Sequence, residues 1–233
     1  MASRSQSPEF SPLAFGEELT AVPAYKAAST TSVNFSNLLD RPLRLHEDLK
    51  SGCGGQLWPA GMVLAQHMLR YHRDSLQGAR ILELGSGGGL VGLGVAIGCR
   101  LDHTLYITDQ ENMMELMHKN IELNGLESRV NELVLNWGDP LPNEVVRESP
   151  NLILAADCVY FEPAFPLLLA TLEDLLGLCK EAVIYFCFKK RRRADMQFMK
   201  NARKKFVVEE IEDQDRERFS REGLFLYTFK RKP

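Results

Sequence analysis

One stretch limits what this chain can fold into more than any other: ARILELGSGGGLVGLGVA, residues 79–96. Residues 81–84 are a short apolar run typical of a buried parallel strand, and residues 90–96 are typical of the helix that follows it. The glycines among residues 85–89 allow positive φ and let a ligand approach the main chain closely. This pattern predicts a nucleotide-type binding loop. The alternative is that the glycines only allow close packing of the helix on the strand.

The residues around the loop help to decide which nucleotide it binds. A phosphate-binding loop would close on Gly-Lys-Ser/Thr, which is absent. The dinucleotide pattern G-x-G-x-x-G fails from Gly85 and matches only from Gly87, a register that begins past the turn. Glu83 would stand at the mouth of the loop, where it would repel a pyrophosphate and attract an ammonium group. The stretch therefore favours S-adenosylmethionine, with its amino group near Glu83.

A second apolar run, LYITD at residues 105–109, ends on Asp109. Doubly wound folds place an acidic residue at about this interval after the loop, where it binds the hydroxyl groups of a ribose. Asp109 could also be the N-cap of a helix beginning near Glu111, and both roles can hold together. NAD enzymes share this feature. Asp109 therefore supports a ligand that contains adenosine but gives no evidence that the ligand carries a transferable methyl group.

Length and composition bound the remaining possibilities. The 233 residues are enough for one large domain, or a domain with an arm, and the net charge of −3 gives no global basic field for nucleic acid. The five cysteines form no C-x-x-C pair, so we expect reduced, mostly buried thiols in the cytosol or nucleus. The histidines form no zinc-binding spacing. We expect no membrane span and no signal peptide, because the chain lacks the apolar runs that both require.

The N-terminal part of the chain is predicted to be a tail followed by an extension of the main domain. Residues 1–31 are rich in Ser, Ala, Thr and Pro and predict a flexible tail. A single domain is expected over residues 32–233, with an N-terminal extension over residues 32–75. Within it, Val33 to Phe35 and Leu43 to His46 alternate in polarity, which predicts a hairpin before the main sheet.

The extension ends in a predicted helix over residues 56–72, which has Pro59 near its first turn. The glycine-rich residues 51–55 before it predict a flexible joint. Trp58 stands at the start of the helix. It could pack there as a hydrophobic staple or form a wall of the cofactor pocket. The spacing of the apolar residues does not distinguish these two roles.

Beyond Asp109 the patterns of strands and helices alternate along the chain. Strands are expected at 129–137, 151–157, 181–188, 206–211 and 224–229, and helices at 112–125, 162–178 and 191–205. Only a polar segment separates the last two strands, which predicts an antiparallel edge pair. The fold expected is an α/β, Rossmann-like, doubly wound sheet of seven strands, mostly parallel with an antiparallel last strand.

Polar and aromatic residues gather where these strands end. Ligands in such sheets lie beyond the carboxyl ends of the strands, and Glu83, Asp109, Trp137 and Asp157 each stand at such an end. Asp157 is followed by Cys-Val-Tyr, which brings a carboxylate and the phenol of Tyr160 beside the expected sulfonium. The alternative is that Asp157 caps the next helix and Tyr160 packs on the rim.

With these residues in place, the sequence resembles the seven-β-strand protein lysine methyltransferases, in the branch that modifies translation elongation factors and chaperones in the cytosol. The matching residues are Trp58, the run LELGSGGGLVGL, Asp109, Asn120, Asn124, Trp137-Gly138 and Asp157-Cys158-Val159-Tyr160. They cover roughly residues 50–190. The KKRRRAD stretch that begins at Lys189 most resembles fungal members that methylate elongation factor 1A.

The resemblance implies a set of site residues. Those expected to bind the cofactor are Trp58, Glu83, Gly85, Ser86, Gly87, Asp109, Trp137 and Ala156. Asp157 and Tyr160 are implied as catalytic residues that shape a lysine channel. Relatives with Asn-Pro-Pro-Tyr act on planar nitrogens, and Cys158-Val159 departs from that pattern, which disfavours such a substrate.

Three functions remain in competition. The first, implied by the resemblance, is a monomeric, cytoplasmic S-adenosylmethionine-dependent lysine methyltransferase acting on a translation elongation factor, such as elongation factor 1A, or a chaperone. The second is a methyltransferase of a small amine or an RNA base. The third is a noncatalytic module that binds S-adenosylmethionine or a partner.

The basic run Lys189 to Arg193 follows a strand on the ligand side, and Arg203 to Lys205 continue the charge. This run could be a solvated helix start, a docking site for an acidic protein surface, or a nuclear import or RNA contact.

Overall fold

A computed structural model describes residues 28–233, apart from the side chains of Ser51 and Cys53. Within this part of the chain the main sheet has seven strands in the order β5-β4-β3-β6-β7-β9-β8. Their bounds are Ile81–Leu84 (β3), Leu105–Asp109 (β4), Val130–Val134 (β5), Leu152–Ala156 (β6), Val183–Lys189 (β7), Phe206–Glu210 (β8) and Leu224–Arg231 (β9).

The direction of the strands confirms the predicted fold class. β3 to β7 pair in parallel, whereas β9 lies antiparallel between β7 and β8. The chain moves outward from β3 through β4 to β5 and then returns to place β6 on the other side of β3. This reversal of strand order, between β3 and β6, is where doubly wound sheets bind their ligands.

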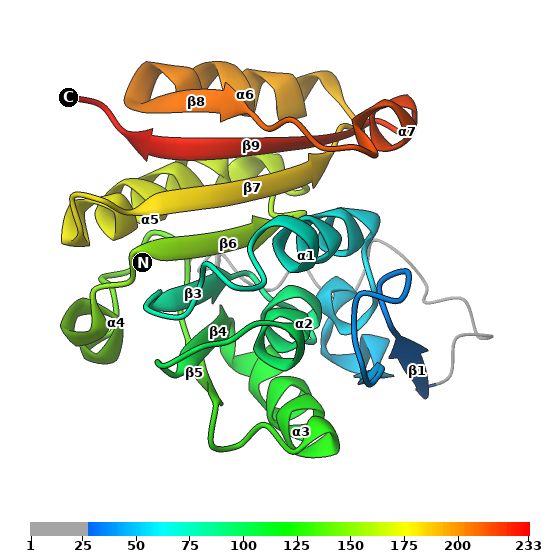
Figure 1. Ribbon diagram of the computed structural model, residues 1–233. Helices are drawn as coiled ribbons and strands as arrows, with labels where there is room; N and C mark the ends of the chain where they lie inside the picture. The colour runs from blue at the N-terminus through cyan, green and yellow to red at the C-terminus, as the bar shows by residue number, and fades with distance from the viewer. Residues whose placement is uncertain (1–27) are drawn as a thin grey trace, which may run out of the picture.

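Helices cover both faces of the sheet (Figure 1). The helices are α1 (Pro59–Tyr71), α2 (Leu90–Gly98), α3 (Met114–Asn124), α4 (Asn143–Glu148), α5 (Phe165–Leu178), α6 (Arg193–Lys205) and α7 (Arg216–Arg221). One buried apolar cluster joins α1, α2 and α3 to the sheet, and a second joins α5 and α6 to its opposite face. The aromatic part of the second cluster includes Phe186, which stacks on Phe198 and on Phe229 at centroid distances of 5.6 and 4.8 Å.

The predicted N-terminal hairpin is present as a separate two-stranded sheet of β1 (Ser29–Val33) and β2 (Leu43–Glu47). One edge of β2 pairs with β1, and two asparagines of α3 hold the other. The side chain of Asn124 exchanges two hydrogen bonds with the backbone of Arg44, at 2.9 and 2.7 Å. Asn120 does the same at His46, at 2.7 and 3.2 Å. Because residues four apart lie on one helix face, the two amides meet alternate residues of one strand.

The structure corrects several boundaries. β1 begins at Ser29, inside the expected tail, and residues 1–27 of that tail lie outside the described residues. The first strand ends before Phe35, whose positive φ of 51° belongs to a turn that buries its ring against Gly94. The expected flexible joint forms two short 3-10 turns, Leu49–Ser51 and Cys53–Gly55.

Two short helices were not predicted. α4 and α7 have six residues each, and α7 lies within the polar segment that was expected to separate the last two strands. A helix of one and a half turns shows too little apolar periodicity to be seen in sequence, and each of these two buries a single side chain, Val145 in α4 and Phe219 in α7.

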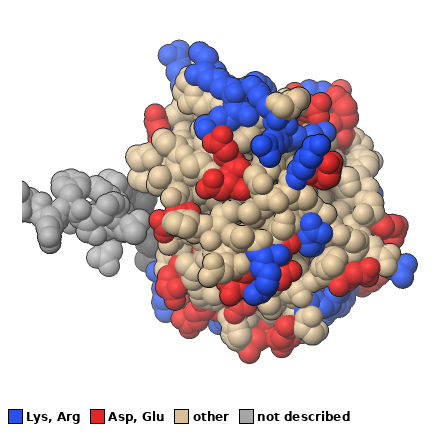
Figure 2. Space-filling view, turned by 90° about the vertical axis from the view of Figure 1, so that its left-hand side faces the viewer, with Lys and Arg blue, Asp and Glu red and all other residues tan. Residues whose placement is uncertain are grey.

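The two basic groups, Lys189 to Arg193 and Arg203 to Lys205, lie at opposite ends of α6. α6 starts beside the carboxyl ends of the strands and runs to the opposite end of the sheet. Its 13 residues span roughly 20 Å, so it carries Arg203 to Lys205 away from the ligand side. Lys and Arg gather along the top of the face seen in Figure 2, which is the amino-end side of the parallel strands. There Lys230 pairs with Glu209 at 3.2 Å, and Lys205 pairs with Glu173. Arg203 to Lys205 therefore do not add to the charge of Lys189 to Arg193 on the ligand side of the sheet.

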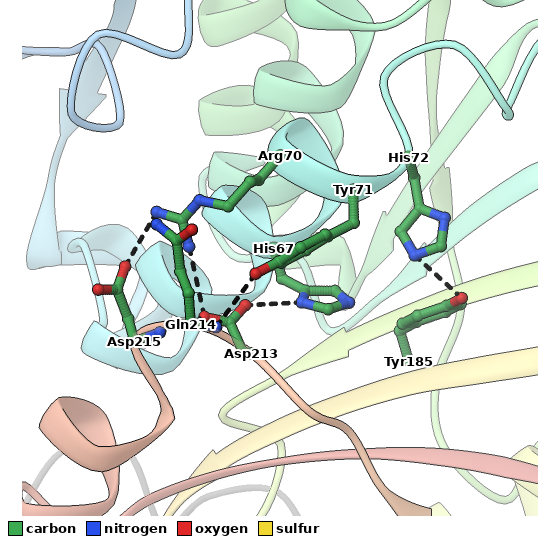
Figure 3. Close-up of polar contacts among 8 residues, drawn as sticks. All are labelled: His67, Arg70, Tyr71, His72, Tyr185, Asp213, Gln214 and Asp215. Carbon is green, nitrogen blue, oxygen red and sulfur yellow. Dashed lines mark hydrogen bonds and ion pairs between the residues drawn. The ribbon is translucent and has the colours of Figure 1, made fainter.

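A polar cluster fastens the segment after β8 to α1 (Figure 3). Asp213 accepts from Nδ1 of His67 at 2.8 Å and pairs with Arg70 at 3.3 Å, and Arg70 also pairs with Asp215 at 2.9 Å. Nearby, the hydroxyl of Tyr185 lies 3.2 Å from Nε2 of His72. His67 is buried, and burial lowers its pKa below the ordinary value despite the Asp213 carboxylate.

We predict that His67 makes the fold sensitive to acid. Above the ordinary pKa of about 6.5 the ring is neutral in both the folded and unfolded states, so it contributes no pH dependence. As the pH falls through that value, the unfolded chain takes up a proton that the folded chain resists. Stability should therefore fall below about pH 6.5. Between about pH 7 and pH 5, the melting temperature of the His67→Gln variant should fall by less than that of the wild type.

The exposed His103 provides the control. His103→Gln should follow the wild-type melting curve at each pH. Equal acid sensitivity in the wild type and in His67→Gln would contradict the role of His67.

Candidate cofactor and acceptor site

A cavity of about 290 Å³ opens at the carboxyl ends of the parallel strands, at the reversal of strand order. The structure brings all ten site residues expected from the sequence to its lining: Trp58, Glu83, Gly85, Ser86, Gly87, Asp109, Trp137, Ala156, Asp157 and Tyr160. The N-terminal extension closes part of the cavity through His46, Glu47 and Gly54. One pocket thus unites residues separated by about a hundred positions of sequence.

The glycine loop between β3 and α2 depends on glycine at identifiable positions. Gly85, Gly87 and Gly89 have φ of 63°, 55° and 86°, which favour glycine. A Cβ on Gly87 would lie 2.4 Å from the carbonyl oxygen of Gly54. A Cβ on Gly85 would lie 3.0 Å from the Cys158 sulfur. The loop therefore needs bare backbone both for its conformation and for the close approach of its neighbours.

Side chains and one backbone carbonyl from other elements satisfy polar backbone groups of this loop. The Gly87 N–H donates to Oδ2 of Asp109 at 2.7 Å, and Nδ2 of Asn120 donates to the Gly88 carbonyl at 2.9 Å. The Ser86 N–H donates to the carbonyl of Thr108 at 3.0 Å. These bonds fix the loop before any ligand binds, which reduces the ordering cost of binding.

Glu83 also accepts a hydrogen bond from the backbone of α2, a role that was not predicted. Its side chain is fully buried on the cavity lining, and Oε2 accepts from the Gly92 N–H in the first turn of α2 at 2.7 Å. The carboxyl group therefore satisfies an N–H that the helix leaves unpaired. Burial raises its pKa to about 8, although hydrogen bonds from Gly92 and Val91 oppose that shift. A ligand ammonium would favour the ionised form.

Asp109 holds the loop and does not cap a helix. Besides Gly87, it accepts from the Gln110 N–H through Oδ1 at 2.8 Å. The N-cap position of the following turn is Gln110, so the interpretation of Asp109 as N-cap is wrong. Burial raises the pKa of Asp109, and the two backbone donors oppose the shift. Asp109 remains on the cavity lining, where a ribose-binding role stays a prediction.

Aromatic residues form the walls of the cavity. Trp58 occupies the N-cap position of α1 and also lines the cavity, which favours the pocket wall over the hydrophobic staple. Trp137 also lines the cavity, lies against Gly85 and meets Tyr160 edge-on at a centroid distance of 6.4 Å. The neighbouring Gly138 N–H donates to the Thr171 hydroxyl at 2.8 Å, which fixes the turn that carries Trp137.

Asp157 is held in an unusual way. Its φ of 57° lies in the left-handed region, and its N–H donates to the Cys187 carbonyl at 2.8 Å. It does not cap the next helical turn, whose N-cap position is Phe161. Both carboxylate oxygens accept from the guanidinium of Arg191, at 2.8 and 2.7 Å. Arg191 was not predicted as a site residue, although its place just after a strand on the ligand side was a usable signal.

The remaining chemistry near Asp157 argues against a covalent intermediate on this chain. Cys158 follows Asp157 directly in the chain, but it is buried and its Sγ donates to the Leu84 carbonyl at 3.3 Å. Burial raises the pKa of this thiol well above its ordinary value, so it stays a protonated, weak nucleophile. In the described part of the chain, no three His, Cys, Asp or Glu side chains lie close enough to hold a metal.

The sequence comparisons identify this arrangement. The family model described as lysine methyltransferase matches residues 37–205. The chain belongs to this lysine methyltransferase family. It is 39% identical over 224 residues to the protein-lysine N-methyltransferase EFM6 of Saccharomyces cerevisiae, covering 87% of this chain and 91% of that protein. It is 34% identical to the mouse EEF1A lysine methyltransferase 3, over 60% of this chain and 57% of that protein.

Among solved structures, TYW2 of P. horikoshii in complex with MeSAdo has a similar fold, with a TM-score of 0.51 and 13% identity over 88% of this chain and 71% of that chain. At 13% identity the similarity shows a shared fold and nothing about function. The chain is thus an S-adenosylmethionine-dependent methyltransferase, and the cavity fits that cofactor. A bare-backbone loop, buried carboxylates and two indole walls match its amino acid, ribose and adenine groups in chemistry.

One prediction at this site concerns Asn120, which links the hairpin to the glycine loop. Asn120→Ala removes the partners of the His46 backbone and of the Gly88 carbonyl, at about 1–3 kcal/mol for each buried group left unsatisfied. We expect a lower melting temperature and weaker binding of S-adenosylhomocysteine by calorimetry. Asn124→Ala is the matched control, because the Asn124 side chain binds the Arg44 backbone of the hairpin and not the glycine loop. It should reduce stability and largely spare affinity. Equal losses of affinity would contradict this division.

Another prediction at this site concerns Glu83. With a pKa of about 8 it is mostly protonated at pH 7, and a ligand ammonium beside it should drive the proton off. Calorimetry of S-adenosylhomocysteine at about pH 7, in two buffers of different ionisation enthalpy, should show proton release that Glu83→Gln abolishes. Affinity of the wild type should rise as the pH is raised towards about 8. The same proton release in both proteins would leave Glu83 only as the acceptor for the first turn of α2.

Proposed function

We propose that this methyltransferase modifies the ε-amine of a lysine on a translation elongation factor, with elongation factor 1A as the first candidate and a chaperone as the second. The observation that carries the proposal is the arrangement of Asp157 and Tyr160 at the cavity edge. Asp157 is buried, whereas Tyr160 and the next residue, Phe161, are each 47% exposed. A buried carboxylate and the exposed aromatic ring of Tyr160 on the cavity lining fit a long aliphatic amine that enters from the surface of a protein.

The name of the mouse relative supports the choice of elongation factor 1A. The cytosol is proposed as the compartment because cysteines 99, 158, 179 and 187 are all free. No helix of the described residues is both long and apolar enough to cross a membrane. We also propose that the chain acts as a monomer and does not need nucleic acid.

The site residues would act by positioning and by charge. Bound S-adenosylmethionine supplies an electrophilic methyl group on its sulfonium. A lysine with a pKa of about 10.4 must lose its proton before it can attack, which costs roughly 4–5 kcal/mol at pH 7 without assistance. Asp157 would orient the amine, and Tyr160 would shape the channel against Trp137. Alignment of donor and acceptor can contribute several kcal/mol more.

Methyl transfer from radiolabelled S-adenosylmethionine tests the proposal directly. Purified elongation factor 1A from a source that has not been methylated should take up label that protease removes and nuclease does not. Label on nucleic acid or on a small amine would contradict the protein substrate, and no label on any acceptor would favour a noncatalytic module.

Asp157→Asn tests the acceptor site. It keeps the size of the side chain and removes its charge, so transfer to elongation factor 1A should fall steeply while S-adenosylhomocysteine affinity changes little. The exposed carboxylate of Glu162 offers a matched control, and Glu162→Gln should retain wild-type transfer. Near-normal transfer by Asp157→Asn would contradict the role of Asp157.

A further inference from the structure

Arg191 is fixed at both ends beside the acceptor site. Its backbone N–H donates to Oδ2 of the fully buried Asp195 at 2.7 Å. Its guanidinium makes the bidentate pair with Asp157 and lies 5.4 Å from the centre of the Trp58 ring. The Arg191 side chain is 30% exposed and the Asp157 side chain 5%. Arg191 therefore reaches from the surface into the wall of the cavity, which it also lines.

The neighbouring basic residues have different positions. Arg192 donates to Asp195 and to the Tyr160 carbonyl, so it holds the start of α6. The Lys190 N–H donates to the Gly223 carbonyl at 2.7 Å, and Lys190 and Arg193 are exposed. Of the run Lys189 to Arg193, Arg191 is thus the residue whose side chain pairs with Asp157.

This pairing bears on the protonation of the acceptor. A bare carboxylate beside a lysine favours the ammonium form and raises the pKa of the lysine, which opposes the proton loss that attack requires. A guanidinium bound to both oxygens cancels most of that field. Oδ1 also accepts from the Lys189 N–H at 3.3 Å, so Oδ2 is the oxygen that keeps a lone pair to orient an amine. The ion pair can therefore align the acceptor without holding it in its unreactive charged form.

We propose that Arg191 is a positioning residue that neutralises Asp157, so that the acceptor lysine meets the cofactor as a neutral amine. The proposal rests on the function proposed above, in that it assigns the lysine to the Asp157 side of the cavity. It makes Arg191 responsible for the pH range of the reaction, and it separates the role of this arginine from that of the exposed basic residues around it.

Sinefungin provides a test that needs no protein substrate. In this analogue of S-adenosylmethionine, a carbon bearing a primary amine stands in place of the methylated sulfur. The amine therefore probes the charge at the position where methyl transfer occurs. In Arg191→Gln the Asp157 carboxylate is no longer neutralised, and it should attract the sinefungin ammonium. The affinity for sinefungin relative to S-adenosylhomocysteine should rise about tenfold at pH 8, measured by calorimetry.

A second substitution should move the same ratio the other way. Asp157→Asn leaves the Arg191 guanidinium without its carboxylate, so sinefungin should lose affinity relative to S-adenosylhomocysteine. Arg191→Lys keeps the positive charge and should stay close to the wild-type ratio. Arg193→Gln, on the exposed neighbour, is the matched control and should leave the ratio unchanged. If Arg191→Gln does not fold, as judged by circular dichroism, Asp157→Asn and Arg191→Lys still decide the question.

The pH profile of kcat gives the second measurement, with elongation factor 1A as acceptor. In Arg191→Gln the rising limb should move to higher pH by about one unit or more, and Arg191→Lys should restore it. A purely structural role would lower kcat equally at every pH. The other titratable groups that line the cavity are unchanged in these variants: His46, Glu47, Glu83, Asp109, Cys158 and Tyr160.

The two proposals fail in different ways. If wild-type protein does not methylate elongation factor 1A, the proposed substrate is wrong, and the sinefungin ratios still test Arg191. A ratio that stays at the wild-type value in both folded Arg191→Gln and Asp157→Asn would overturn the role of Arg191.

Discussion

The structure depends on satisfying the backbone of the glycine loop at residues 85–89. A loop made almost entirely of glycine exposes its N–H and C=O groups inside a largely buried site, where an unpaired group costs about as much as a lost hydrogen bond. Asp109 at the end of β4 accepts from one N–H, and Asn120 from α3 donates to one carbonyl. The loop is therefore held by the elements that follow it, and the ligand site exists only when the sheet is assembled.

The same constraint explains why the N-terminal extension belongs to the site. Asn120 binds the loop and β2 together, and Asn124 extends the contact by one helical turn. Glu47 at the end of β2 then accepts from the Leu57 N–H at 3.2 Å, just before Trp58. Gly54 lies directly over Gly87 because neither residue has a side chain. A segment that looks separable in sequence thus forms one wall of the cavity.

Charge in this cavity is distributed so that each buried carboxylate has a partner. Glu83 meets the N–H groups of α2, Asp109 meets two backbone donors, and Asp157 meets a guanidinium. Backbone donors leave the first two available to a cationic or hydroxyl-bearing ligand without a competing cation. The ion pair at Asp157 gives that end of the cavity little net charge. The cofactor and the acceptor amine would therefore meet different electrostatic environments within one pocket, which suits a reaction between a cation and a neutral amine.

The sequence by itself determined the succession of the main strands and the longer helices along the chain, the glycine loop and the carboxylates at the strand ends. Strand and helix periods and the conformational freedom of glycine are local properties. It could not show that Asp109 holds Gly87, that Glu83 accepts from α2, or that β1 begins at Ser29. It missed Arg191 because the partner, Asp157, is 34 residues away in sequence. Only the tertiary structure decided these pairs, since hydrogen bonds and ion pairs between distant residues depend on which elements the packed sheet brings together.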